Sequence, residues 1–180
     1  MPISFSSVWA DWINFIKNPR IDPLPDSFLE LPKKVLPYLF AFDFLLMIPT
    51  VGLLNLVGID DMDHAVVEMM DQPLYLFMAA VIVAPLMEEA IFRLPIGVVW
   101  PSNFKIVFWF FTLAFALMHI TNFTSQVATY LIPILVLPQL ILALLIGYVR
   151  VGWGFWYGVL FHAIHNFVIV GIVLLVGPTT

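Results

Sequence analysis

The stretch APLMEEAIFR, residues 84–93, places two adjacent carboxylates and a guanidinium in a segment otherwise apolar enough to span a membrane. An ionisable residue at bilayer depth costs at least about 2.5 kcal/mol on insertion scales, so this group requires an explanation. Glu89 and Arg93 lie four residues apart and can pair on one helix face, which lowers the cost of both. Glu88 lies about 100° away around the helix and is left over. Glu88 is therefore the first candidate for chemistry.

The composition is that of an integral membrane protein. Of the 180 residues, 62% are hydrophobic and only 11% are charged, and the mean hydropathy is +1.03. Soluble domains are about 45–50% apolar and about 25% charged. We therefore expect one domain with several transmembrane helices, whose partners are the lipid bilayer and a substrate within it, with no role for nucleic acid. The absence of cysteine excludes disulfides, thiolate metal sites and a cysteine nucleophile.

Hydropathy along the chain predicts an all-α polytopic membrane protein with about five transmembrane helices. Residues 1–34 are expected to form an interfacial amphipathic helix, with Trp9 and Trp12 on one face, and a proline-rich linker. A first transmembrane helix at 35–57 and an acidic loop at 58–72 follow, and residues 73–180 are expected to form a four-helix core. The four spans of this core are expected from Pro73 through the glutamate pair, from Lys105 to Ile120, from Val127 to Val149 and from Trp153 to Val176.

The basic residues predict the orientation in the membrane, because cytoplasmic loops are enriched in lysine and arginine. With five spans, all seven fall on one side, which places the N-terminus in the cytoplasm and the C-terminus outside. They are Lys17, Arg20, Lys33, Lys34, Arg93, Lys105 and Arg150.

Two further spans carry polar residues. His119 lies late in the third span, and His162 and Asn166 lie four residues apart on one face of the fifth. Buried imidazole and carboxamide groups must find hydrogen-bond partners. If spans two and three form a hairpin that turns at residues 101–104, Glu88 lies level with residue 117 and His119 lies only about 3 Å further along the axis. A hydrogen bond between them, direct or through a water, is then expected.

The same register depends on where the second span ends. A span that stopped at Pro95 would place Glu88 and His119 at clearly different depths. His162, about nine residues into the fifth span, lies at a depth compatible with a shared site in the middle of the membrane. Pro85 has no N–H and therefore leaves a carbonyl about one turn earlier unpaired, which favours a bend just before the glutamates.

These groups predict a hydrolytic site. Glu88 and His119 could together deprotonate a water, and His162 and Asn166 are donors that could stabilise the oxyanion on an attacked carbonyl. Such a site needs no nucleophilic serine and no metal.

The three motifs, Glu88-Glu89-x-x-x-Arg93, Phe115-x-x-x-His119 and His162-x-x-x-Asn166, together resemble the signature of the CPBP family. That family comprises the CAAX-processing prenyl-protein endoproteases and the bacteriocin-processing or self-immunity ("Abi") membrane proteins. The resemblance covers about residues 73–170.

The resemblance implies a glutamate-dependent intramembrane endopeptidase that uses no metal or other cofactor. By motif position, Glu88 and His119 would activate the water, His162 and Asn166 would form the oxyanion hole, and Glu89 and Arg93 would support them. With one span ahead of the core, the chain looks like a prokaryotic member in the cell membrane. Its substrate would be a peptide or membrane protein, with or without a lipid, and the oligomeric state is not indicated.

Other functions fit parts of the same pattern. A non-catalytic immunity or scaffold protein could bind a peptide partner at this site. A zinc hydrolase could use Glu88, His119 and His162 as ligands, although no His-Glu-x-x-His stretch occurs. A transporter or proton channel would also line a membrane interior with such groups, but no repeat of the spans is visible.

Several of these polar residues also have a purely structural interpretation. Glu89 and Arg93 could form a structural ion pair, Asp43 a packing contact, and His165 a structural or cavity-lining contact. His64 falls in the acidic loop and is interpreted as a solvated residue.

Overall fold

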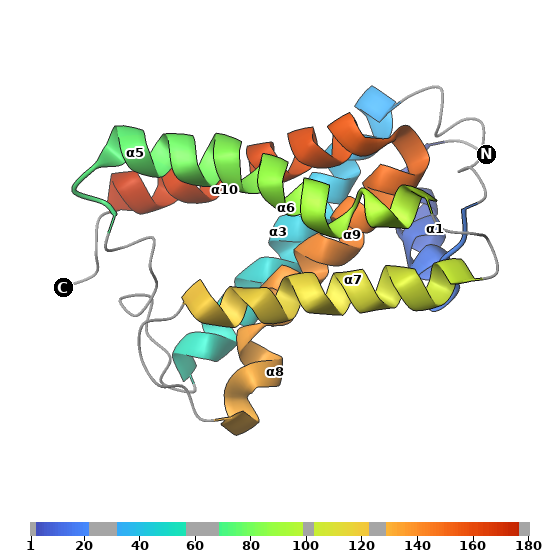
Figure 1. The fold of residues 1–180 in the computed structure, drawn as a ribbon, viewed down its shortest axis with the longest axis horizontal. Coiled ribbons are helices and arrows are strands. Elements are labelled where there is room, and N and C mark those ends of the chain that lie inside the picture. Colours follow the sequence, from blue (N-terminus) through green and yellow to red (C-terminus); the bar gives the residue numbers. More distant parts are fainter. Residues whose placement is uncertain (1–2, 22–31, 57–68, 99–102, 123–128, 177–180) are drawn as a thin grey trace.

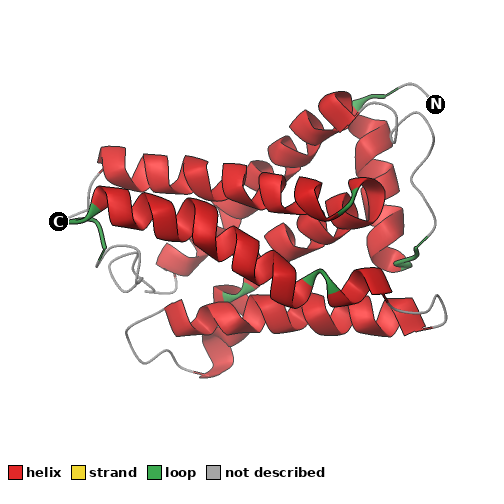
Figure 2. Cartoon of the chain, turned by 45° about the horizontal axis from the view of Figure 1, so that its top comes forward, coloured by secondary structure: helices red, strands yellow, loops and turns green. Residues whose placement is uncertain are grey.

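The computed structural model describes residues 3–21, 32–56, 69–98, 103–122 and 129–176 (Figure 1). Figure 2 shows that helix is the only regular structure in this part of the chain, so the all-α prediction is confirmed. The longer helices are α1 (Phe5–Lys17), α3 (Pro32–Leu56), α6 (Ala84–Phe92), α7 (Phe104–Met118), α9 (Leu137–Trp153) and α10 (Phe155–Val176). The short ones are α5 (Pro73–Phe77), η2 (Met78–Val83), η3 (Pro95–Val98), η5 (His119–Asn122), η6 (Thr129–Leu131) and α8 (Ile132–Leu135).

Four continuous helical segments are long and apolar enough to cross a membrane, and a bent pair makes a fifth. The continuous segments are Pro32–Leu54, Pro73–Phe92, Phe104–Asn122 and Phe155–Leu175. The expected count of about five spans is therefore confirmed. The division at residues 34, 57 and 72 stays a prediction, and most of its linker and acidic loop, including His64, lie outside the described residues.

The fourth expected span is broken rather than continuous. Residues Thr129–Leu135 and Leu137–Trp153 meet at an angle of 41°. Pro138, in the first turn of α9, cannot donate a hydrogen bond to the turn before it, and its ring crowds that turn, so the helix axis changes direction at Val136. The span also ends at Trp153 rather than at the expected Val149.

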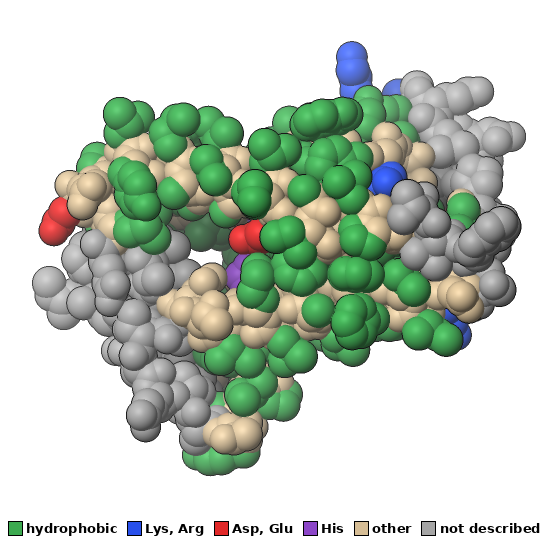
Figure 3. Space-filling model, in the orientation of Figure 1, with side chains coloured by type: hydrophobic (Ala, Val, Ile, Leu, Met, Phe, Trp, Pro, Cys, Tyr) green, Lys and Arg blue, Asp and Glu red, His purple; other side chains and the backbone are tan. Residues whose placement is uncertain are grey.

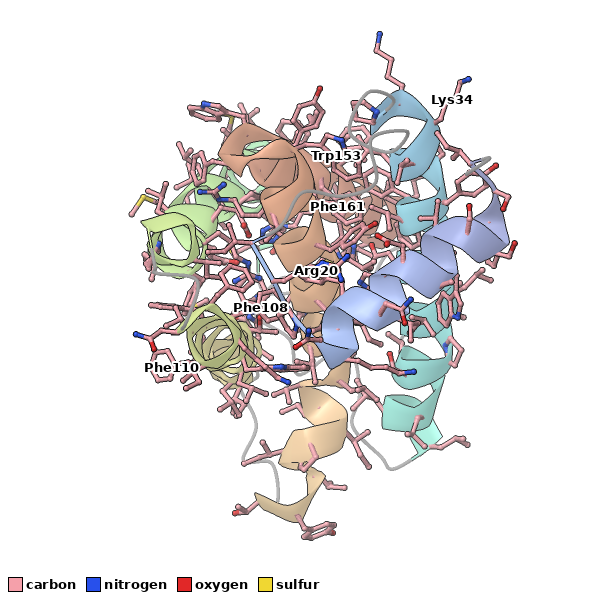
Figure 4. All side chains as sticks on the ribbon, turned by 90° about the vertical axis from the view of Figure 1, so that its right-hand side faces the viewer. Arg20, Lys34, Phe108, Phe110, Trp153 and Phe161 are labelled. Atoms are coloured by element: carbon pink, nitrogen blue, oxygen red, sulfur yellow. The ribbon has the colours of Figure 1, made fainter. Side chains whose placement is uncertain are left out.

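Helix α9 is the centre of the bundle and lies against α3, α7 and α10 (Figures 1 and 4). Its close approach to α7 depends on Gly147, because a Cβ at that position would lie 2.6 Å from the ring of Phe108. Figure 4 shows Phe108 on the inner side of α7 and Phe110 on the outer side, and their exposed fractions are 0% and 63%. The aromatic outer side suits lipid, and the inner side is packed like the interior of a soluble protein.

The amphipathic N-terminal helix packs on this bundle. Ser4 and Ser7 form a reciprocal cap at the start of α1, and Val8, Trp12 and Phe15 are buried. Phe15 contacts Phe108 and Tyr148 edge to face, and the Tyr148 hydroxyl donates a hydrogen bond of 2.6 Å to Asp11. Helix α1 is therefore tied to α9 by both an aromatic and a polar contact.

The outer surface is largely hydrophobic. Figure 3 shows apolar side chains over most of one face, with Lys and Arg side chains visible only in the half that holds α1. Helix α10 runs to the opposite end of the molecule (Figure 1). An apolar surface of this extent is incompatible with water and is expected of a protein embedded in lipid.

Candidate active site

The helical segment before the glutamates changes its hydrogen-bond register. Residues 78–83 form a π-helical turn, in which the Ala84 N–H binds the Ala79 carbonyl five residues earlier. In the same pattern the Ala80 carbonyl would pair with residue 85, which is proline and has no N–H. The Asn166 side chain supplies the missing donor, with Nδ2 2.7 Å from the Ala80 oxygen. The unpaired carbonyl expected from Pro85 therefore exists, and α10 satisfies it.

Glu89 lies at the centre of a buried network. Its Oε1 accepts a hydrogen bond from His162 Nδ1 at 3.1 Å, and its Oε2 lies 3.6 Å from Arg93 Nε. Neither the Glu89 nor the Arg93 side chain is exposed, so the expected pairing on one helix face is present in the structure. Burial of the two opposite charges together lowers the cost of each.

The Arg93 guanidinium is held by contacts from two other helices. Nη2 donates to the Ala143 carbonyl on α9 at 3.4 Å, and Cζ lies 4.5 Å above the centre of the Phe115 ring on α7. The same ring contacts two further site residues, with centroid distances of 4.6 Å to His119 and 5.7 Å to His162. The Phe115 ring therefore makes apolar contacts with the arginine and with both histidines.

Glu88 faces both histidines with the same oxygen. Its Oε2 lies 3.8 Å from His119 Nε2 and 3.8 Å from His162 Nε2. These distances are too long for direct hydrogen bonds. Within the described part of the chain, Oε2 is buried and accepts no hydrogen bond. A buried carboxylate oxygen without a donor implies that a water or a substrate group completes the site.

The protonation of His119 follows from its second nitrogen. Nδ1 lies 2.8 Å from the Phe115 carbonyl, which can only accept, so the ring must carry a proton on Nδ1. In the neutral ring, Nε2 is then an acceptor directed at Glu88. Two acceptors 3.8 Å apart do not attract each other, but one water can donate a hydrogen bond to each.

The prediction of this meeting assumed that the second span continues as a helix to a turn at residues 101–104, and that assumption is wrong. Helix α6 ends at Phe92 and does not extend to residue 101. Such an early end was expected to separate Glu88 and His119 in depth, yet they lie 3.8 Å apart. The reason is that the chain continues away from α6 through the 3₁₀ turn Pro95–Val98 before it reverses into α7 (Figure 1). The 3₁₀ turn thus continues the second segment beyond the end of α6.

One pairing was not foreseen. Asp43 on α3 and His165 on α10 are both buried, and His165 Nδ1 lies 2.5 Å from Asp43 Oδ2. The sequence signal was an acidic residue within an apolar span, but 122 residues separate the two positions and no spacing rule joins them. The site is therefore bordered by a second buried carboxylate–histidine pair.

The site can be reached from outside. The Glu88 and His119 side chains are 19% and 11% exposed. Figure 3 shows an acidic and a histidine side chain together in a hollow between the α5–α6 segment and α7. Across the residues that the structure describes, no three His, Cys, Asp or Glu side chains are grouped to hold a metal ion.

Comparison with known proteins identifies the family. The model of the type II CAAX prenyl endopeptidase Rce1-like family matches residues 70–168, which is 99 of the 180 residues. The chain belongs to this family. As an Rce1-like protein with several apolar helices, it is a multi-pass integral membrane protein of the CAAX protease class, which acts on peptide or protein substrates. No curated protein and no solved structure matches it.

The matched range defines what the family shares with this chain. It begins just before α5 and ends within α10, so it contains all seven named residues of the three motifs. Helices α1 and α3 precede it, and with them Asp43. The Asp43–His165 pair therefore joins a helix outside the matched range to one inside it.

Proposed function

We propose that this Rce1-like protein is an intramembrane endopeptidase in which Glu88 and His119 activate a water that hydrolyses a peptide bond. The observation that carries the proposal is that Glu88 Oε2 and His119 Nε2, both hydrogen-bond acceptors when the imidazole is neutral, lie 3.8 Å apart on two partly exposed side chains. A water that donates to both has its oxygen lone pairs directed away from them. Such a water is oriented as a nucleophile.

The proton and the electrons follow from this geometry. The water gives one proton to the Glu88–His119 pair while its oxygen attacks the carbonyl carbon of the substrate, forming a tetrahedral oxyanion. When the carbon–nitrogen bond breaks, the same proton passes to the leaving nitrogen. The products are a carboxylic acid and an amine, and the site returns to its starting state.

His162 is suited to stabilise the oxyanion. Nδ1 donates a hydrogen bond to Glu89, and Nε2 lies 3.8 Å from Glu88 Oε2, so a ring that carries a proton on each nitrogen has its Nε2–H as the donor for the oxyanion. Arg93 in turn holds Glu89. Asn166 gives one N–H to Ala80 and has a second N–H by valence, which we assign to the oxyanion.

The proposal extends to substrate and orientation. We expect a peptide or membrane-protein segment, with or without an attached lipid, and a prokaryotic cell membrane. The N-terminus would be cytoplasmic and the C-terminus outside, because basic side chains gather in the half of the molecule that holds α1.

The test uses purified protein in liposomes with a quenched peptide library, with and without a chelator. The wild type is compared with Glu88→Gln and with Asp71→Asn, a matched change of an exposed carboxylate outside the site. Cleavage by wild type and Asp71→Asn alone, unchanged by chelator, supports the proposal. Cleavage that chelator abolishes would favour zinc chemistry at Glu88, His119 and His162. A biological effect retained by Glu88→Gln without any cleavage would favour a non-catalytic binding role.

A further inference from the structure

The Asp43–His165 pair occupies a position where a charge is expensive. Asp43 is the twelfth of the 25 residues of α3, and its side chain is fully buried. A carboxylate at such a position in a membrane span is costly unless a specific partner compensates it. His165 Nδ1 is that partner for Oδ2, and Oδ1 makes no hydrogen bond within the described residues. A contact used only for packing would be made at lower cost by apolar side chains.

The pair lies at the turn of α10 that carries the site. His165 follows His162 by three residues and directly precedes Asn166. His162 contacts Glu89 on α6, Asn166 contacts Ala80 in η2, and His165 contacts α3 from another side of the same helix. One turn of α10 is therefore fixed between two different partners.

Aromatic contacts extend the attachment to α3. Phe40 stacks on Phe161 with a centroid distance of 4.1 Å and an interplanar angle of 10°. Phe44 stacks on the His165 ring at 5.8 Å and 11°. These rings join α3 to α10, while the polar pair fixes which residue of α10 is directed at α3.

The geometry points to Asp43 and His165 as positioning residues that set the rotation of α10 and thereby place His162 and Asn166 against Glu88 and Ala80. This assignment rests on the proposed function for its catalytic consequence. A helix with its side chains has a radius of about 5–6 Å, so a rotation of about 20° moves a side-chain atom by about 2 Å. Displacements of about 1 Å can cost a hundredfold in rate. Asp43, which lies outside the range that the family model matches, thus sets the positions of His162 and Asn166, which lie inside it.

The test separates the hydrogen bond from packing. Asp43→Ala removes the acceptor, and His165→Phe keeps a ring of similar volume against Phe44 but removes the donor. Asp43→Asn keeps an acceptor oxygen for His165 Nδ1. Asp11→Asn is the control, because Asp11 also joins two helices, through Tyr148, but contacts no site residue. Each variant is measured in liposomes for kcat, KM and thermal midpoint.

We expect kcat to fall about 10- to 100-fold in Asp43→Ala and His165→Phe, with KM within about twofold. Asp43→Asn should keep kcat within about threefold of wild type, and Asp11→Asn should leave it unchanged. A purely structural role predicts lower thermal midpoints with unchanged kcat, and that result would overturn the assignment. His165→Phe decides the matter if Asp43→Ala does not fold.

A second measurement does not depend on cleavage. The chain has no cysteine, so a cysteine pair can be placed at Phe77 and Phe167, whose rings contact each other across α5 and α10 at 6.1 Å. Rotation of α10 should slow cross-linking by a short bismaleimide several-fold in Asp43→Ala relative to the Asp43 parent. Equal rates would contradict the positioning role. If no variant cleaves any peptide, the proposed function fails while the cross-linking rates still judge this inference.

Discussion

The contact of α7 with α9 and the contact of α6 with α10 are built on opposite principles. The first is close and apolar, with Gly147 leaving room for the Phe108 ring. The second is polar and looser, with Glu88 Oε2 3.8 Å from His162 Nε2, and Asn166 of α10 bonded to the π-helical turn that precedes α6. The difference separates a close-packed contact from a partly exposed one that water can reach. The positions of the residues around Glu88 therefore depend on the closely packed helices that hold them.

The largest effect is expected on the loose side, at the water-activating pair. His119→Ala removes Nε2 and should lower kcat by about 10²- to 10⁴-fold, the usual contribution of general acid–base catalysis. Its thermal midpoint should stay close to that of the wild type, because the hydrogen bond from His119 to the Phe115 carbonyl is local, within one turn of the chain. Steady-state cleavage and thermal unfolding check both parts. Full cleavage by His119→Ala would remove it from the mechanism.

The close contact predicts the reverse pattern. A Cβ at position 147 would lie 2.6 Å from Phe108, so Gly147→Ala should destabilise the protein by about 1–3 kcal/mol through overpacking. Gly171→Ala is the matched control, since nothing lies within 4 Å of a Cβ there. Thermal unfolding in detergent compares the two. A stable Gly147→Ala protein would mean that α7 and α9 can separate at little cost.

Pro85 and Asn166 should behave as a coupled pair. Asn166→Ala leaves the half-buried Ala80 carbonyl without its side-chain donor and should cost about 1 kcal/mol. Pro85→Ala restores a backbone N–H, so the double variant should be more stable than Asn166→Ala alone. A double-mutant cycle of unfolding free energies measures this coupling. Simple additivity would show that the amide does not serve the carbonyl that the proline leaves unpaired.

The smallest of the four effects is expected at Arg93, which joins the two sides. Arg93→Lys keeps the charge near Glu89 but loses the flat stacking on Phe115 and the bond to Ala143. We expect kcat to fall several-fold, less than for His119→Ala, because the lysine still partners Glu89. The rate of the same peptide cleavage is the measurement. A larger loss than in His119→Ala would mean that the guanidinium does more than hold Glu89.

The sequence predicts the helical fold and the number of spans well, because hydropathy is a local signal. The all-α fold and the number of spans follow from apolar runs, and the meeting of Glu88, His119 and His162 follows from three motifs on separate spans. The roles of those residues stay predictions that await the cleavage assay.

Features that depend on packing between distant helices were not predictable. The break at Val136 had a visible cause in Pro138, but proline also occurs inside the continuous helix α3, at Pro37 and Pro49. Neighbouring helices decide which prolines interrupt a span. The Asp43–His165 pair likewise has no signature in the linear order of residues, since each partner alone is one polar residue in an apolar helix.

The proline next to the π-helical turn has a consequence for how this chain can diverge. Pro85 creates a need that a side chain on another helix, Asn166, fulfils. A descendant that lost the proline would regain its backbone donor, and position 166 would then have to supply only the donor proposed for the oxyanion. A descendant that lost the asparagine first would leave the Ala80 carbonyl without a hydrogen-bond donor. The order of the two changes is therefore constrained: loss of the proline before the asparagine leaves no carbonyl without a donor, whereas the reverse order does.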